Sequence, residues 1–299
     1  MRSLSRKRPI TAFVLFAVVI TIVAFGLPLL AENGIGLIAI DLPGVAPFVL
    51  VAALALAGLA FVVTSAADGR SAVRELRRRV FHFRVNPLWY LLALLILPLT
   101  AVISATGVTG TNVVAEFFSR QDLMAAVAVE ALIAFLLVNW WEETAFTGFV
   151  LHRLQPRMGP VRASVVTTWV QALVHVPLVF VAGGVTDGRV ASDQVPFYLA
   201  ALFILPIPVR LLITWLYNTA GHSIPVVGVF HAGLGVATGS LLLPEIAPGF
   251  DQIWVYAGFA VVAAIVLALT RGRLGYEPRR TAGSLVSSEG VVDHLGVTS

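Results

Sequence analysis

The sequence has no cysteine and little charge. Without cysteine, the 299-residue chain has no disulfide, no thiolate nucleophile and no cysteine-ligated zinc site. Charged residues make up 12% of the chain, hydrophobic residues make up 58%, and the mean hydropathy is +0.92. Ordinary soluble domains carry roughly 25% charged residues. The composition therefore argues against a water-soluble fold and indicates an integral membrane protein.

The excess of basic residues does not indicate nucleic-acid binding. The net charge is +4 and the pI is near 10.0, but the basic residues lie beside apolar segments and form no recurring basic face. Lys7 is the one lysine among 20 basic residues, and this preference for arginine favours a GC-rich, bacterial source. We expect a bacterial plasma-membrane protein surrounded by lipid, with no nucleic-acid partner.

Eight apolar segments recur along the chain, and each can cross a ~30 Å hydrocarbon core, which takes about 20 helical residues. They lie near 10–31, 44–66, 86–105, 121–151, 160–182, 195–217, 223–243 and 250–270. Helices satisfy the backbone in lipid, and the alternation of a transmembrane barrel is absent. The predicted fold is all-α, a single bundle of eight transmembrane helices. The first segment is too long for a signal peptide, so we interpret it as a retained helix.

The distribution of basic residues predicts the orientation. If both termini are cytoplasmic, 17 of the 20 lysine and arginine residues lie on the cytoplasmic side. The basic stretch 73–84 then becomes a cytoplasmic loop, and the alternative is an interfacial amphipathic helix on anionic lipid. We divide the chain into a cytoplasmic N-terminus (1–9), a helical domain (10–273) and a disordered cytoplasmic tail (274–299).

Ionisable residues inside the apolar segments are candidates for function, because each costs several kcal/mol in lipid unless it is paired or hydrated. The candidates are Glu130, Glu142, Glu143, His175, Arg210 and His231. With a rise of ~1.5 Å per residue, Glu142, His175 and His231 fall in one layer of the membrane on three helices. Glu130 is rotated by about 120° from Glu142, so we expect it to make a polar contact elsewhere.

Two carboxylates and two imidazoles that meet in a low-dielectric pocket can carry out hydrolysis. A buried carboxylate accepts a proton from water, while an imidazole orients that water or stabilises an oxyanion. Alternatively, Glu142, His175 and His231 hold a divalent metal such as zinc with one position open for water. Both arrangements are open at this point.

Three strings resemble motifs of the CPBP family of intramembrane proteases, which contains the type II CAAX prenyl endopeptidases and bacterial proteins linked to bacteriocin processing or self-protection. WWEETAFTGFVLHRLQ (140–155) is similar to the family's EExxxR motif. QALVHVPL (171–178) resembles its motif with an aromatic residue four positions before a histidine. TWLYNTAGHSIPVVGVFHAGLG (214–235) resembles its third region, which ends in His-x-x-x-Asn. The strings occur in the expected order, within a core of about 121–243.

The resemblance implies an eight-helix intramembrane bundle with a cavity open to the cytoplasmic side. It implies an endopeptidase, either metal-dependent or metal-free, that cleaves a membrane-associated or lipidated peptide or protein. Glu142 would be the general base on the hydrolytic water, with His175 as its partner. His231 would hold the water or the oxyanion, and Glu143 would be an accessory carboxylate.

Three positions depart from the family pattern. The motif arginine is Thr147, the aromatic residue is Gln171, and the asparagine after the last histidine is Gly235. The first change removes the partner of Glu143, and the last removes a donor able to support an oxyanion. These changes put both the activity and the substrate class in question.

Arg210 has two interpretations. Its side chain either snorkels to the headgroups or replaces the missing arginine as the partner of Glu143. The function has alternatives as well: a catalytically inactive membrane scaffold or regulatory protein with the same bundle, or a transporter with a carboxylate site near the midplane. The endopeptidase is the leading prediction.

Overall fold

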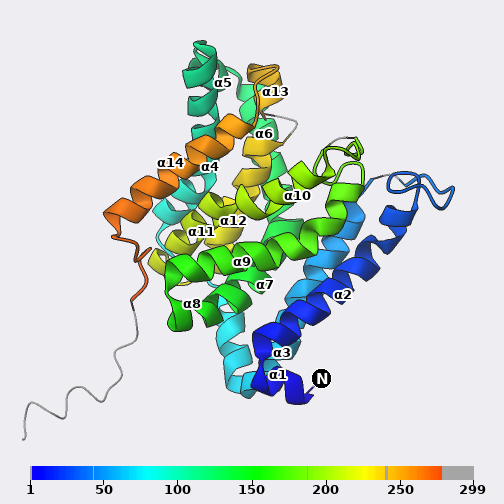
Figure 1. Cartoon of the computed structure of the whole chain (residues 1–299). Helices are drawn as coiled ribbons and strands as arrows, with labels where there is room; N and C mark the ends of the chain where they lie inside the picture. The colour runs from blue at the N-terminus through cyan, green and yellow to red at the C-terminus, as the bar shows by residue number, and fades with distance from the viewer. Residues whose placement is uncertain (1, 43, 187, 240–241, 278–299) are drawn as a thin grey trace, which may run out of the picture.

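The computed structural model describes residues 2–42, 44–186, 188–239 and 242–277, and within these ranges it contains helices and no strand (Figure 1). The all-helical prediction is confirmed. In chain order the helices are α1 (Arg2–Lys7), α2 (Pro9–Leu30), α3 (Ala46–Val80), α4 (Pro87–Thr109), α5 (Val113–Ser119), α6 (Gln121–Ala134), the π-helix η1 (Phe135–Asn139), α7 (Trp140–Ala145), the π-helix η2 (Phe146–Leu151), α8 (His152–Met158), α9 (Pro160–His175), the 3₁₀-helix η3 (Val176–Phe180), α10 (Val195–Ile204), α11 (Ile207–Thr219), α12 (Ile224–Thr238), α13 (Leu242–Ile246) and α14 (Ile253–Leu269).

Several helical segments are long and apolar enough to cross a membrane. In the described ranges there are six of them: Pro9–Leu30, Ala46–Val80, Pro87–Thr109, Gln121–Met158, Pro160–Phe180 and Val195–Thr219. The apolar helices Ile224–Thr238 and Ile253–Leu269 are shorter. The chain is therefore an integral membrane protein, while the count of eight spans and the cytoplasmic termini stay predictions.

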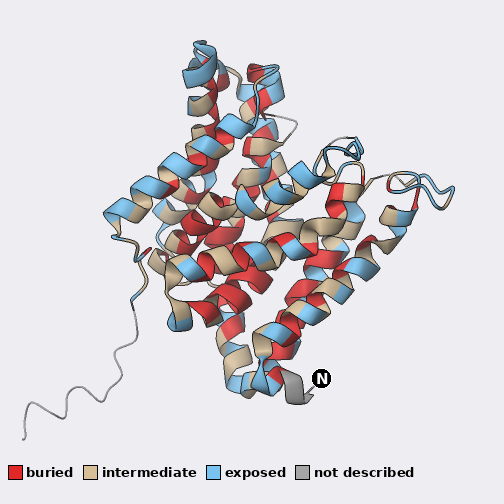
Figure 2. Cartoon of the chain, viewed as in Figure 1, coloured by how far each residue is buried: buried red, intermediate tan, exposed pale blue. Residues whose placement is uncertain are grey.

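Large apolar side chains cover the outside of the bundle. Val23 of α2 and Leu269 of α14 are 75% and 79% exposed. Figure 2 shows exposed residues along the outer sides of α2 and α14, with the buried residues on the sides that face the bundle. Such a surface marks contact with lipid rather than with water.

The starts of α9 and α12 are set by local sequence signals. Gly159 ends α8 with a φ of 77°, a conformation that favours glycine, and Pro160 then begins α9. Ser223 caps α12, because its side-chain oxygen accepts a hydrogen bond from the amide of Val226 at 3.4 Å. These two signals fix where the helices that carry the predicted site histidines begin.

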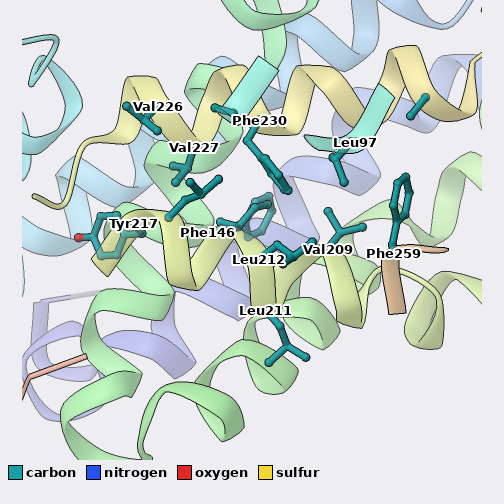
Figure 3. Close-up of a cluster of buried hydrophobic side chains, with 14 of the residues drawn as sticks. Leu97, Phe146, Val209, Leu211, Leu212, Tyr217, Val226, Val227, Phe230 and Phe259 are labelled. Atoms are coloured by element: carbon teal, nitrogen blue, oxygen red, sulfur yellow. The ribbon is translucent and has the colours of Figure 1, made fainter. Parts of the chain in front are cut away.

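Helix α12 lies at the centre of the bundle, in contact with α4, α6, α7 and α11. Figure 3 shows Phe146, the first residue of η2, packed between Val227 and Phe230 of α12 and Leu212 of α11. All four side chains are fully buried. This packing joins the segment that carries the two glutamates to the two helices opposite it.

The basic stretch 73–84 is not the loop that its charge predicted. Helix α3 continues to Val80, interrupted only at Gly69, whose φ of 79° and ψ of −170° are not helical. Leu76 and Val80 are fully buried, and Leu76 packs close to Gly148 of η2. Residues 73–80 are helical because this apolar stripe packs on the bundle, and 81–84 are not helical. The helix of the amphipathic alternative is therefore present, while its contact with anionic lipid stays a prediction.

Packed residues are found beyond both ends of the predicted helical domain, 10–273. The N-terminal segment contains a short helix, α1, which contacts α2 and α3. At the other end, Leu274 is fully buried and its carbonyl accepts a hydrogen bond from Asn218 at 3.0 Å. The packed structure therefore extends past residue 273, and the rest of the predicted tail, 278–299, lies outside the described residues.

Candidate active site

The two glutamates lie on α7, a short α-helix between the π-helices η1 and η2. A π-helical turn is rare and is frequent at functional sites, because its extra residue shifts the side chains that follow around the helix axis. Glu142 is 6% exposed and Glu143 is fully buried. Each carboxylate therefore needs a partner inside the protein.

Glu142 lies between the two histidines. Its Oε1 is 3.3 Å from Nε2 of His175, the last residue of α9. Its Oε2 is 3.8 Å from Nδ1 of His231, in the middle of α12. The structure therefore brings together the three residues that the sequence placed in one layer on separate helices.

A second contact of His175 assigns its proton. Nδ1 lies 2.8 Å from the backbone carbonyl oxygen of Gln171. A carbonyl oxygen only accepts, so Nδ1 carries a hydrogen and donates it. Nε2 is then the nitrogen that exchanges a proton with Glu142. One proton shared between Nε2 and Oε1 of Glu142 forms a hydrogen bond between the two side chains. This is the arrangement of an acid–base couple.

Glu143 is paired with Arg210, which reaches it from α11. The two guanidinium nitrogens donate to the two carboxylate oxygens at 2.7 and 3.1 Å, and Arg210 is only 2% exposed. The planar fork of arginine fits a carboxylate in this way and secures a charge that is buried. The predicted pairing is therefore present, and the snorkelling interpretation is wrong.

Two of the three departures from the family motif contact the same guanidinium. The hydroxyl of Thr147 donates to Glu143 and accepts from Arg210 at 2.9 Å. The side-chain oxygen of Gln171 accepts a hydrogen bond from the other terminal nitrogen of Arg210. A hydrocarbon ring at position 171 offers no such acceptor. Thr147 and Gln171 therefore both hydrogen-bond to the guanidinium of Arg210, and together these three residues hold Glu143 in place of the motif arginine.

His231 contacts Glu143 more closely than Glu142. Its Nδ1 lies 2.8 Å from Oε1 of Glu143, without the alignment of a hydrogen bond. Each carboxylate thus has one histidine as its nearest imidazole, which the sequence did not indicate. Gly235, one turn farther along α12, faces open space, since an added Cβ would meet nothing within 4 Å.

Glu130 lies outside this site. Its Oε2 is buried and has no hydrogen-bond partner among the described residues, so the separate polar contact that we predicted for it is not seen there. Its Oε1 lies near Gly239, the residue that follows α12. Glu130 is thus a second, partly buried carboxylate on α6, separate from the acid–base couple.

Sequence reasoning missed a polar cluster beside the site. Arg79, which was assigned to a loop, is 5% exposed and donates to the carbonyl oxygen of Gly148 at 3.1 Å and to the hydroxyl of Tyr217 at 2.9 Å. That hydroxyl is also 3.0 Å from Nδ1 of His152. Gly148 belongs to η2, so Arg79 holds the segment that follows the glutamates. Its spacing of three from Leu76 was the available signal that Arg79 faces inward.

A cavity of about 150 Å³ adjoins the couple. His175, Arg210 and His231 line it on one side. The remaining wall is mostly apolar and includes Ala172, Leu202, Pro206, Val209, Ile213 and Leu234. Leu202 belongs to α10, none of whose residues is buried. A cavity of this size holds an apolar group about as large as benzene.

The predicted zinc ligands are not arranged as a ligand set. No group of three His, Asp or Glu side chains in the described ranges has the geometry of a metal site. Among the predicted ligands, Nδ1 of His231 is 3.8 Å from Glu142 and closer to Glu143. This arrangement of side chains is suited to proton transfer. Zinc binding stays a prediction, and metal analysis of the purified protein would test it.

Comparison with known proteins agrees with this geometry. Residues 124–237 match the family model described as Rce1-like, type II CAAX prenyl endopeptidase. No curated protein matches the chain. The matched range runs from α6 to α12 and contains both glutamates, both histidines and Arg210. The match covers less than half of the chain, and it supports the resemblance to the CPBP family of intramembrane proteases seen in the motifs.

Proposed function

We propose that the chain is an endopeptidase that hydrolyses a peptide bond of a membrane-associated or lipidated peptide or protein. The observation that carries the proposal is the 3.3 Å contact between Oε1 of Glu142 and Nε2 of His175. Glu142 is buried, and the partly exposed His175 lines the adjoining cavity. An acid–base couple beside a space for substrate is what hydrolysis by water requires.

In the proposed reaction, Glu142 takes a proton from water while the water oxygen bonds to the peptide carbonyl carbon. The electron pair of the C=O bond moves to its oxygen, and the N–H of His231 stabilises the resulting oxyanion. The carbonyl then re-forms as the C–N bond breaks, and the proton held between Glu142 and His175 passes to the leaving amine. The products are a carboxylic acid and an amine.

Arg210 acts through Glu143 in this scheme and is a positioning residue. Glu143 lies 2.8 Å from Nδ1 of His231, and the guanidinium holds that carboxylate in place. Because Gln171 accepts from Arg210 through its side chain and from His175 through its backbone, one residue also ties the cation to the acid–base couple.

The cavity favours an apolar group of the substrate next to the bond that is cleaved. Its lining is apolar at six positions, and its polar residues are Thr168, Gln171, His175, Arg210 and His231. Its volume of about 150 Å³ suits one side chain or one segment of a lipid. A substrate embedded in the bilayer would supply such a group without leaving lipid.

The test uses Glu142→Gln, which keeps the shape of the side chain and removes the base. Purified protein in proteoliposomes is given a library of membrane-anchored peptides with prenylated and unmodified C-termini, and cleavage is followed by mass spectrometry. We expect the wild type to cleave a subset and the variant to lose turnover by about 10²- to 10⁴-fold. Glu130→Gln, a matched change at a carboxylate outside the site, should leave turnover unchanged.

Equal turnover by Glu142→Gln and the wild type would refute Glu142 as the base. If the wild type cleaves nothing, yet the same membrane protein co-purifies with the wild type and with Glu142→Gln, the chain acts as the catalytically inactive scaffold. A cleavable peptide that remains uncut and bound on the Glu142→Gln variant would identify the substrate.

A further inference from the structure

Helix α1 lies beside the C-terminal part of α3 (Figure 1), and both segments are rich in basic residues. Beyond Gly69, four exposed arginines recur at i, i+4, i+7 and i+8, which places them on one side of the helix. With the exposed cations of α1 they form the basic face, defined as Arg6, Lys7, Arg70, Arg74, Arg77 and Arg78.

The opposite side of this segment is fixed to the bundle. Leu76 and Val80 are fully buried, and Arg79 donates to the carbonyl of Gly148 and to the hydroxyl of Tyr217. The helix is therefore unable to turn about its axis without breaking these contacts. The basic face is held outward.

The part of α3 that carries the arginines, residues 70–80, begins where a membrane span of ordinary length ends. From Ala46 to Asp68, at ~1.5 Å per residue, α3 is long enough to cross a ~30 Å hydrocarbon core. The interruption at Gly69 then changes the direction of the helix, and its φ of 79° favours glycine. The basic face follows directly after this point, at the level expected for lipid headgroups.

Exposed aromatic residues follow the basic segment. Phe81 and Phe83 are 51% and 43% exposed, and their rings meet Trp140 edge-on at centroid distances of 5.4 and 5.2 Å. Aromatic side chains are enriched at the boundary between lipid and water. Phe81 and Phe83 follow the arginines directly, so they support placing the basic face at the level of the lipid headgroups.

The positive charge of the basic face is only partly neutralised. Asp68 pairs with Arg153, and Glu75 pairs with Arg78 at 3.0 Å. Within the described ranges, no carboxylate lies at ion-pair distance from Arg70, Arg74 or Arg77. Three neighbouring guanidinium groups are thus available to an external anion.

We propose that the basic face binds the anionic headgroups of phospholipids at the membrane surface. Guanidinium groups bind phosphate oxygens in pairs, and each basic residue near an anionic leaflet strengthens association roughly fivefold. The fixed outward orientation, the level after Gly69 and the flanking phenylalanines together favour a lipid headgroup over a soluble anion. This inference does not depend on the proposed hydrolytic activity.

The test compares lipids retained by the whole protein in a non-ionic detergent, counted by native mass spectrometry. Phosphatidylglycerol and phosphatidylcholine are offered in equal amounts to the wild type, to Arg74→Gln/Arg77→Gln and to Arg271→Gln/Arg273→Gln. The last variant removes the same charge from two exposed positions after α14. We expect phosphatidylglycerol to be preferred by the wild type and this control, and to bind the first variant roughly thirtyfold more weakly.

Three outcomes would overturn the proposal: equal retention of phosphatidylglycerol by the wild type and Arg74→Gln/Arg77→Gln, equal retention of the two lipids by the wild type, or displacement of the lipid by millimolar inorganic phosphate. The last would indicate a site for small anions. Arg74→Lys/Arg77→Lys keeps the charge and should restore binding to near the wild-type level. Failure of that variant to bind would show that charge does not carry the interaction, and the proposal would fall.

Discussion

The guanidinium of Arg210 on α11 and the carboxylate of Glu143 on α7 form a buried two-point ion pair, with N–O distances of 2.7 and 3.1 Å. The family motif would place the arginine four residues after Glu143, where this chain has Thr147. The cation therefore reaches the same carboxylate from another helix, and the threonine takes part as a shared hydrogen-bond partner.

Removing this cation should destabilise the bundle. In Arg210→Leu the carboxylate of Glu143 stays buried without its counter-charge, a loss of about 3–5 kcal/mol for a broken buried pair. We expect a lower unfolding temperature in detergent and reduced turnover. Thr147→Arg/Arg210→Leu returns an arginine to the motif position and should recover part of both. An Arg210→Leu protein as stable as the wild type would show that the pair contributes little.

Two glycines of α12 should respond differently to alanine. At Gly235 an added Cβ meets nothing within 4 Å, so Gly235→Ala should change stability by less than about 0.5 kcal/mol. At Gly228 the added Cβ would lie 3.1 Å from the ring of Phe135 and 3.2 Å from Cα of Trp140, and overpacking of this kind costs about 1–3 kcal/mol. Thermal unfolding of the two variants side by side measures the difference.

Gly235→Asn tests the third departure from the family motif. The open space accommodates the side chain, and its amide would supply the donor that the motif carries at this position. We expect turnover equal to or above that of the wild type, measured with any peptide that the wild type cleaves. Loss of turnover at unchanged stability would mean that the space is needed by the substrate.

Adjacent arginines of α3 should differ sharply in their contribution to stability. Arg79→Met removes hydrogen bonds from a charged donor to Gly148 and Tyr217, each worth about 1.5–3 kcal/mol. Arg78→Met, the matched control, removes an exposed pair with Glu75, worth about 0–1 kcal/mol. Denaturant unfolding in detergent should separate the two variants clearly. Similar losses would contradict the buried role of Arg79.

Metal removal tests how the water is activated. The couple of Glu142 and His175 is complete in itself, and the described residues contain no three-ligand group. We therefore expect turnover to survive dialysis against EDTA and to be unaffected by added zinc. Loss of turnover that zinc restores would show that Glu142, His175 and His231 rearrange into a ligand set, and metal analysis of the purified protein would then show bound zinc.

The sequence predicted the helical bundle and the meeting of its polar residues, for one physical reason. Lipid permits few ionisable groups, so those inside the apolar segments were conspicuous, and most of them were expected to need partners inside the protein. Glu142, His175 and His231 do meet, and Arg210 does pair with Glu143.

The features that were missed depend on packing between distant segments. Arg79 was assigned to a loop because its neighbours are charged, and its partner Tyr217 lies 138 positions away in the sequence. The π-helical turns on both sides of α7 are backbone adjustments that leave no pattern in the residue types. The preference of His231 for Glu143 over Glu142 is a matter of side-chain placement, which helix periodicity does not determine.

Because Arg210 is 67 positions after Glu143, the ribosome makes the carboxylate well before it makes the guanidinium that pairs with it. When α7 leaves the ribosome and reaches the bilayer, the cation that neutralises it has not yet been made. The carboxylate must enter as a neutral acid or wait in a hydrated environment until α11 arrives. We therefore expect α7 to become stably inserted only together with α11, so that chains truncated before residue 210 remain extractable or are degraded.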